Sequence, residues 1–356
     1  MFKAKKDNFW VMTGIIIIAV IARLYGLDLE TLSLEQKISV MLSVSAGVLS
    51  VIGLYLLVKE LFDEKLAALS SFLLAVSFWH VMVSKLGSKD IFTSFTLIFS
   101  FYFIWNGLKY GRIFDFFLAG LFGGAGFYTG REYFMAPLVF LLVFWNYWEY
   151  IKNDFSLSKY EQTKARVLGG FSLLLITVMT VVLPVGFYVW QNPGFILSAD
   201  NFVLASTEPF AQIYGNFIWI VDKLLLINFG NGNLISWPLS IFFVIGLIKE
   251  MTHWLKRKHG HLSVAHTLIF LWLFIMPIPV LLTAGLPSVL ALSIILPPIM
   301  ILSAKGLWWV IEKLNRWNYI VYPHQHKDLV GLDAAPLLAM IALLLSIAVL
   351  EISKIV

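Results

Sequence analysis

The chain has 356 residues, of which 60% are hydrophobic and only 13% are charged, and it contains no cysteine. This composition excludes a water-soluble globular protein, and the lack of cysteine excludes disulfides, thiolate metal sites and a cysteine nucleophile. The net charge of +5 is distributed between apolar runs rather than gathered in one patch, so we expect membrane lipid, and no nucleic acid, as a partner.

Apolar runs that can cross a bilayer contain about 17 to 25 residues. Runs of this kind predict an all-α, polytopic membrane protein with eleven transmembrane helices in a single domain, 1–356. Helices one to six lie within 1–150, and helices seven to eleven lie within 151–356, with a long outer loop at 191–233. The predicted spans are 9–26, 37–60, 65–85, 90–109, 113–129, 133–150, 167–190, 234–251, 264–284, 287–309 and 335–354.

Lysine and arginine accumulate on the cytoplasmic side of membrane proteins. With the N-terminus inside, 19 of the 26 lysine and arginine residues fall on the cytoplasmic side and seven on the other. We therefore predict a multi-pass protein of the cell membrane with a cytoplasmic N-terminus and, because eleven is odd, an external C-terminus. Within the outer loop, an apolar stretch at 217–229 predicts a helix that lies on the membrane surface.

Ionisable residues near the outer face are few, and each is a candidate for function. Lys85, Lys89 and Asp90 occupy the short turn between the third and fourth spans, with Asp90 in the first turn of the fourth span. A carboxylate at that position complements the helix dipole, so a capping role and a catalytic or metal-binding role for Asp90 both stay open.

Two other polar sets face the outer side. Arg131 and Glu132 lie between the fifth and sixth spans, where arginine can chelate phosphate oxygens or simply form a solvated ion pair with the neighbouring carboxylate. Asp28 and Glu30 lie in the brief loop after the first span, and acidic loop residues commonly do no more than face solvent.

A histidine-rich basic segment is predicted on the cytoplasmic side. His253, His259 and His261 flank three consecutive basic residues, 256–258. Their spacing matches no metal signature, so anchoring at lipid headgroups explains the segment better than a metal site.

Several segments resemble the GT-C superfamily of membrane glycosyltransferases, which depend on polyprenyl-phosphate sugars and include protein O-mannosyltransferases and aminoarabinose transferases. The resemblance covers the first 150 residues well and the remainder thinly. Its segments are IARLYGL at 21–27, YLLVKELF at 55–62, LAVSFWH at 74–80, 119–129 and 136–138, with looser matches at 281–283 and 296–298.

The resemblance implies transfer of a sugar from a polyprenyl-phosphate donor to a lipid, glycan or protein acceptor in an outer-face cavity. It places Asp90 at the family's second acidic position, and makes Asp28 and Glu30 further candidates for the base that acts on the acceptor hydroxyl. Lys85 and Arg131 become candidate ligands of the donor phosphate.

The same resemblance assigns candidate residues around the reacting groups. A divalent cation stays an open question, with Asp90 as its candidate ligand. The candidate lining of the substrate cavity is His80, Tyr128 and Glu132.

The first outer loop departs from the family pattern, because only 26–36 separate two spans where family members carry a long loop with an acidic catalytic motif. Two alternatives to an enzyme follow. One is a non-catalytic GT-C-like accessory or lipid-binding protein, and the other is a lipid or sugar transporter. A transporter would be favoured by paired broken helices in two repeated halves, which the sequence does not indicate.

Overall fold

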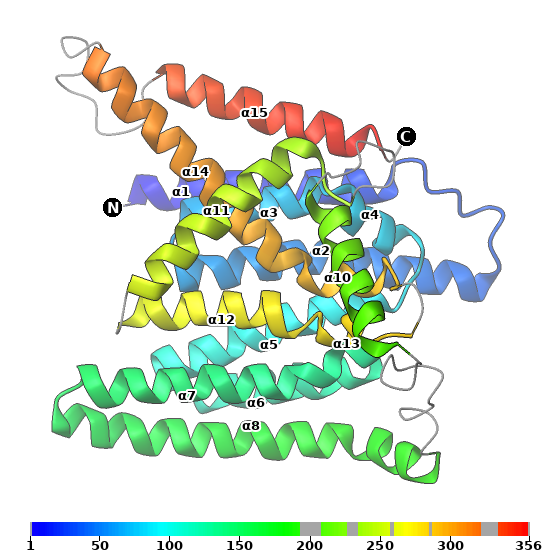
Figure 1. Ribbon diagram of the computed structural model, residues 1–356, viewed down its shortest axis with the longest axis vertical. Helices are drawn as coiled ribbons and strands as arrows, with labels where there is room; N and C mark the ends of the chain where they lie inside the picture. The colour runs from blue at the N-terminus through cyan, green and yellow to red at the C-terminus, as the bar shows by residue number, and fades with distance from the viewer. Residues whose placement is uncertain are drawn as a thin grey trace.

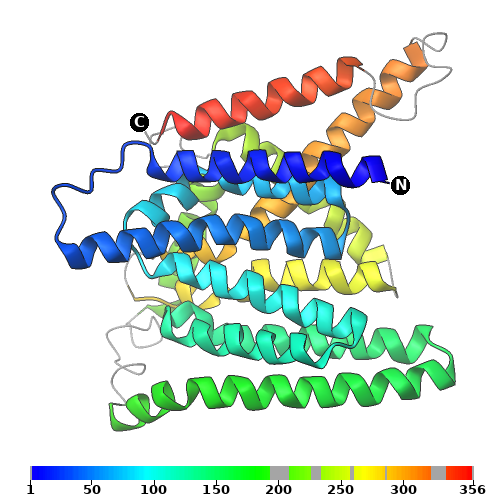
Figure 2. The same cartoon turned by 180° about the vertical axis from the view of Figure 1, so that it is seen from behind.

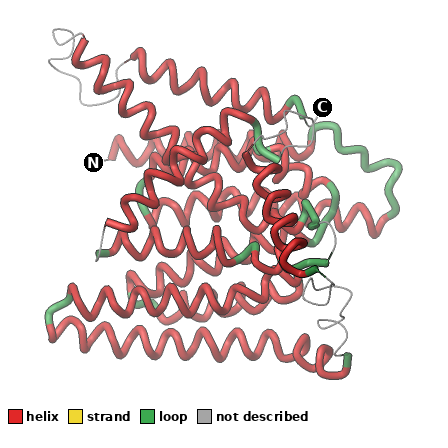
Figure 3. The backbone as a smooth tube through the Cα atoms, viewed as in Figure 1, coloured by secondary structure: helices red, strands yellow, loops and turns green. Residues whose placement is uncertain are grey.

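The computed structural model describes residues 2–192, 208–225, 234–256, 260–284, 287–321 and 334–354. These residues form a bundle of helices without a β-strand, which confirms the all-α prediction (Figure 1, Figure 3). The helices are α1 (Phe2–Leu24), α2 (Leu34–Leu61), α3 (Glu64–Val76), α4 (Phe78–Lys85), α5 (Asp90–Tyr110), α6 (Ile113–Ala125), η1 (Gly126–Tyr128), η2 (Arg131–Met135), α7 (Ala136–Asp154), α8 (Leu157–Gln191), α10 (Pro209–Leu225), α11 (Trp237–Lys256), α12 (His261–Ile275), α13 (Ile278–Leu281), η5 (Ala291–Ile295), α14 (Leu296–Val321) and α15 (Ala334–Ile352).

Each predicted span coincides with one of these helices or with two consecutive ones. Within the described ranges, seven helices are long and apolar enough to cross a membrane, or eight if the bent pair α3 and α4 forms one span. Shorter apolar helices at Phe9–Leu24, Ile113–Tyr128 and Pro336–Ile352 occupy three further predicted spans. The protein is therefore a multi-pass membrane protein, while the count of eleven stays a prediction.

The connections between helices gather at two opposite ends of the bundle (Figure 1, Figure 2). One end contains the turns at 62–63, 111–112 and 155–156, and the other contains those at 25–33 and 86–89. Following the predicted orientation, we call them the cytoplasmic end and the outer end. In Figure 1, α10 stands crosswise to the long helices at the outer end, and it covers the first part of the stretch predicted to be a surface helix.

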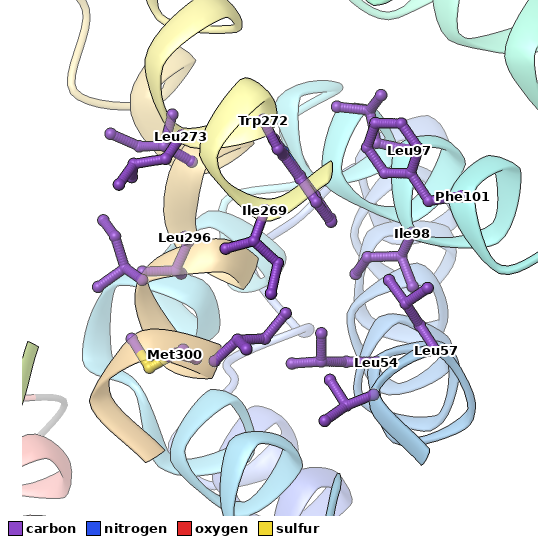
Figure 4. Close-up of a cluster of buried hydrophobic side chains, with 14 of the residues drawn as sticks. Leu54, Leu57, Leu97, Ile98, Phe101, Ile269, Trp272, Leu273, Leu296 and Met300 are labelled. Carbon is purple, nitrogen blue, oxygen red and sulfur yellow. The ribbon is translucent and has the colours of Figure 1, made fainter. Parts of the chain in front are cut away.

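The centre of the bundle is a continuous apolar core (Figure 4). Apolar helices in a membrane are surrounded by lipid rather than water both before and after they associate. Their association therefore depends on close van der Waals packing and not on the hydrophobic effect. The side chains labelled in Figure 4 come from α2 (Leu54 and Leu57), α5 (Leu97, Ile98 and Phe101), α12 (Ile269, Trp272 and Leu273) and α14 (Leu296 and Met300).

Two glycines bring the backbones of α11 and α14 into direct contact. A Cβ atom added at Gly246 would clash with the carbonyl oxygen of Leu302, and one added at Gly306 would clash with the carbonyl oxygen of Phe242. Small residues at such crossings let membrane helices approach closely. The pairing of α11 with α14 is among the most extensive in the bundle.

A break interrupts the predicted span 65–85. α3 and α4 meet at Ser77 with a bend of 54°, so two consecutive helices rather than one occupy this predicted span. The fully buried Arg23 donates from Nη1 to the carbonyl oxygens of Ala19 at 2.8 Å and of Ala75, in the last turn of α3, at 3.4 Å. A cation at the carboxyl end of a helix complements its dipole and satisfies a carbonyl that the ended helix leaves free.

The other side of the break is completed by a carboxylate from the far end of the chain. The fully buried Glu351, on α15, accepts a hydrogen bond from the backbone N–H of Phe78, the first residue of α4, at 2.9 Å. Its other oxygen accepts from the N–H of Ser236, just before α11, at 2.6 Å. Glu351 therefore holds α15, α4 and the start of α11 together.

The close crossing of α11 and α14 can be tested with Gly306→Ala and Gly246→Ala. Either methyl group forces two backbones apart, and we expect each to destabilise the protein by about 1–3 kcal/mol, the usual cost of overpacking. The matched control is Gly186→Ala in α8, where an added Cβ meets nothing within 4 Å. Thermal unfolding of the purified protein measures all three, and equal midpoints for the three variants would contradict the crossing.

The predicted orientation can be tested by labelling the naturally cysteine-free chain from outside. Thr31, between α1 and α2, and Ser158, at the start of α8, are both exposed and lie at opposite ends of the bundle. Thr31→Cys should react with a membrane-impermeant maleimide on intact cells, whereas Ser158→Cys should react only after permeabilisation. The opposite pattern would reverse the assignment of the two ends.

Candidate functional site

The turn between α4 and α5 is fixed to its surroundings at the outer end. Gly87 adopts φ +64°, a left-handed conformation that glycine accepts without strain. From α2, the hydroxyl of Ser39 donates to the carbonyl of Gly87 at 3.0 Å, and that of Ser43 donates to the carbonyl of Ser88 at 3.3 Å. The ammonium group of Lys85 donates to the carbonyl of Tyr25, at the end of α1, at 2.5 Å. These bonds set where α5 begins.

Asp90 is the first residue of α5 and is half-buried. Its carboxylate accepts a hydrogen bond from the hydroxyl of Ser88, and its backbone N–H donates back to Ser88 Oγ at 3.3 Å. The hydroxyl of Ser293, in η5, donates to the Asp90 carbonyl at 3.2 Å. The side chain is thus held in place while part of it stays accessible.

Glu132 brings a second carboxylate to the same region. It is half-buried in η2, next to the exposed Arg131, and interacts electrostatically with Asp90, Arg131 and Lys89. The four charged side chains thus form a loose group around Glu132, where α5 begins and η2 follows η1. Such a group offers a base for a hydroxyl proton and positive charge for a phosphate.

A cavity of about 490 Å³ opens beside this group, between α5, α6 and η1. Its walls are mainly apolar, with Lys89 and the hydroxyl-bearing Thr96, Tyr128 and Thr129 as the polar exceptions. Tyr128 donates its hydroxyl to the carbonyl of Val181 on α8 at 2.9 Å. The remaining lining residues are Phe92, Phe95, Leu121, Phe122 and Ala125.

The other candidate residues lie elsewhere. Asp28 and Glu30 are exposed in the α1–α2 loop, where Asp28 Oδ1 accepts from the Glu30 N–H at 3.0 Å. That loop extends away from the rest of the bundle (Figure 1, Figure 2). His80 is fully buried, with Nδ1 2.5 Å from Arg23 Nη2. Because the guanidinium can only donate, His80 Nδ1 is the acceptor and the ring proton sits on Nε2.

The residues near Asp90 do not form a complete metal site. Among the side chains that the structure describes, no three histidine or acidic groups are placed to share an ion. Asp90 and Glu132 provide two carboxylates, one of which already accepts from Ser88. Hard divalent cations take about six oxygen ligands, of which water can supply some. Asp90 and Glu132 would therefore provide only part of the coordination shell of such an ion.

Buried charges form a second constellation that the sequence analysis did not single out. Glu250 Oε2 lies 2.5 Å from His266 Nε2 and 2.7 Å from Lys305 Nζ, and all three side chains are buried between α11, α12 and α14. Lys305 is one of the 19 basic residues that the sequence assigns to the cytoplasmic side. An ionisable residue inside an apolar run is the pattern that could have predicted such buried charges, and it applies also to Arg23 and Glu351.

Comparisons with known proteins agree with this architecture. Residues 31–188 match the family model described as dolichyl-phosphate-mannose-protein mannosyltransferase. No curated protein sequence matches the chain. Solved structures of the oligosaccharyltransferase of Archaeoglobus fulgidus match nearly the whole length of this chain.

One of these structures, tethered to an acceptor peptide with an NVT sequon, has a TM-score of 0.61 at 15% identity and covers 98% of this chain. Another, AglB in complex with an inhibitory peptide and a dolichol-phosphate, has a TM-score of 0.57 at 14% identity over 99% of this chain. A third, with Zn and sulfate, has a TM-score of 0.52 at 17% identity over 90% of this chain. This chain spans 55%, 55% and 41% of their respective lengths.

The chain therefore has the GT-C fold. The resemblance to the GT-C superfamily is confirmed, by the family match over 31–188 and by the structural match over almost all of the chain.

Proposed function

We propose that this protein is a glycosyltransferase that moves a sugar from a polyprenyl-phosphate donor to an acceptor at the outer face of the membrane. The observation that carries the proposal is the half-buried Asp90 carboxylate, held at the start of α5 of a GT-C fold beside a mainly apolar cavity. The GT-C fold supports glycosyl transfer as the type of reaction, and the carboxylate provides the general base that such a reaction needs.

In the proposed reaction, the acceptor hydroxyl attacks the anomeric carbon while the bond from that carbon to the phosphate oxygen breaks. Asp90 takes the hydroxyl proton, which makes the attacking oxygen more nucleophilic. The polyprenyl phosphate leaves with the electron pair of the broken bond. Lys89 and Arg131 both interact electrostatically with Glu132. They would stabilise the negative charge that grows on this leaving group.

The cavity between α5 and α6 fits the donor's chemistry. Its phenylalanine walls, Phe92, Phe95 and Phe122, suit a polyprenyl chain, and Lys89 provides a cation for the phosphate at the outer end. Lys85, the other predicted phosphate ligand, is not among the residues that line this cavity, and its ammonium group is already bonded to the carbonyl of Tyr25. We therefore expect Lys89 and Arg131 to contribute more to phosphate binding than Lys85.

A second candidate function is a non-catalytic relative that binds the lipid-phosphate sugar without transferring it. It is favoured by the α1–α2 loop, which is short and carries Asp28 and Glu30 into solvent, away from the bundle. In this case the cavity would bind a donor lipid, and Asp90 would serve only as an acidic first-turn residue of α5.

The two functions differ in what Asp90→Asn does. The amide keeps the size of the side chain and an acceptor for Ser88 but cannot take up a proton, so transfer should fall about 10²–10⁴-fold. The measurement is sugar transfer from radiolabelled polyprenyl-phosphate hexoses by the purified protein. Asp28→Asn, in the exposed loop, is the control and should retain activity.

An Asp90→Asn variant that transfers sugar at the wild-type rate would rule out Asp90 as the base. A wild-type protein that binds the donors but transfers none of them would favour the non-catalytic relative.

The donor site can be tested separately by binding. Lys89→Ala or Arg131→Ala should raise the Kd for a polyprenyl phosphate about tenfold or more, because each removes a charge-assisted donor worth about 1.5–3 kcal/mol. Lys85→Ala should have a smaller effect. Lys37→Ala is the matched control, because Lys37 is an outer-end cation of α2 that neither lines the cavity nor is among the charges that act on Glu132. Unchanged affinity in the Lys89 and Arg131 variants would leave these cations as membrane anchors only.

A further inference from the structure

A larger cavity lies at the opposite, cytoplasmic end of the bundle. Its volume is about 660 Å³, and it is enclosed by the ends of α2, α5 and α7 and by the beginnings of α8 and α12. Nothing in the proposed transfer reaction uses it, because Asp90 and the apolar cavity beside it are at the outer end.

The cytoplasmic cavity is strongly basic. Among the described residues, four basic side chains line it, Lys59, Lys109, Lys159 and Arg166, whereas Glu60 is the single carboxylate. Glu60 pairs with Lys109 at 2.9 Å, and Lys59 pairs with Glu64 at 2.8 Å.

Two of these cations have no acidic partner in the part of the chain that the structure describes. Lys159 lies over the ring of Phe155, 4.0 Å from its centroid, and Arg166 packs beside Gly111. Neither forms an ion pair among the described residues. Two uncompensated cations in one partly enclosed cavity favour a ligand with a phosphate group, which guanidinium and ammonium groups bind well.

Aromatic side chains form a large part of the remaining wall. Tyr110 donates its hydroxyl to Glu60 at 2.7 Å, and Tyr147 donates its hydroxyl to the carbonyl of Leu108 at 2.7 Å. Tyr150 and His261 also line the cavity, with ring centroids 6.4 Å apart. Tyrosine is enriched where membrane helices pass through the headgroup layer.

The length of α8 places these cations at that layer. It has 35 residues, so at 1.5 Å per residue it is about 52 Å long, whereas the hydrocarbon core is about 30 Å thick. The apolar part of α8 begins near residue 167, and the preceding turns, with Lys159 and Arg166, therefore extend into the headgroup region.

We propose that this cavity binds the phosphate headgroup of an anionic membrane lipid from the cytoplasmic leaflet. The uncompensated Lys159 and Arg166 bind the phosphate, and the tyrosines occupy the boundary between headgroup and acyl chains. Basic cavities between membrane helices on the cytoplasmic side are suited to such headgroups because anionic lipids are concentrated there. The site is independent of sugar transfer, so the failure of either proposal leaves the other standing.

The experiment is a titration of the purified full-length chain in detergent, followed by thermal unfolding. The probes are short-chain phosphatidylglycerol, phosphatidylcholine with the same acyl chains, and inorganic phosphate. A ligand that binds only the folded protein raises the unfolding temperature, and the dependence on concentration gives Kd. We expect phosphatidylglycerol to bind about tenfold more tightly than phosphatidylcholine, with inorganic phosphate weaker still.

Charge removal then tests the assigned residues. Lys159→Gln with Arg166→Gln should weaken phosphatidylglycerol binding about tenfold or more, since each cation near an anionic surface contributes about 1 kcal/mol. Lys164→Gln is the matched control, because Lys164 lies on the same helix, pairs with Glu161 and does not line the cavity. Lys159→Gln alone, at an exposed position, serves if the double variant fails to fold.

Equal affinity for phosphatidylglycerol and phosphatidylcholine in the wild type would overturn the proposal. It would also fail if the Lys159 and Arg166 substitutions changed binding no more than Lys164→Gln did. If inorganic phosphate bound as tightly as phosphatidylglycerol, the ligand of the cavity would be a soluble phosphate compound and not a lipid.

Discussion

Backbone groups at the break between α3 and α4 must be satisfied by the protein itself, because hydrocarbon offers no hydrogen bonds. Arg23 supplies the donor for the carbonyl of Ala75, and Glu351 supplies the acceptor for the N–H of Phe78. Opposite charges thus complement the two helix ends that the break creates. These two side chains tie α1, α3, α4, α11 and α15 to one point, so the arrangement of this half of the bundle depends on them.

The same break positions the outer site. The 54° bend directs α4 toward the end of α1, where Lys85 bonds to the carbonyl of Tyr25, and the turn after it leads into α5 at Asp90. The site therefore rests on a rigid frame. The second cavity, at the other end of the bundle, differs in character, since its described lining has four cations and three tyrosines, whereas the outer cavity has one cation and three phenylalanines. The two cavities suit different parts of lipid molecules, a headgroup at one end and a chain with its phosphate at the other.

The predicted spans match helices because apolar length is encoded locally, and the GT-C resemblance in the first 150 residues pointed to the fold. The break at Ser77 was not predictable in the same way, since neither proline nor glycine marks it and Glu351 lies 273 residues from Phe78. Asp90 was predicted as a candidate because it stands at a helix start among few charges, and its role stays a prediction. The role of Lys89 in lining the cavity follows from how α5, α6 and η1 pack, which no local pattern contains. The sequence likewise shows that the α1–α2 loop is short but not that it extends away from the bundle.

The position of Glu351 on α15 has a consequence for biogenesis. During synthesis, α3 and α4 enter the membrane well before α15 exists, and Phe78 then has no carboxylate acceptor. Until α15 docks, hydrocarbon favours a continuous helix across Ser77, because such a helix leaves no backbone group unsatisfied. The bent pair in its final form, with the N–H of Phe78 bonded to Glu351, therefore requires the docking of α15, and so does the outer site that follows from the position of α4.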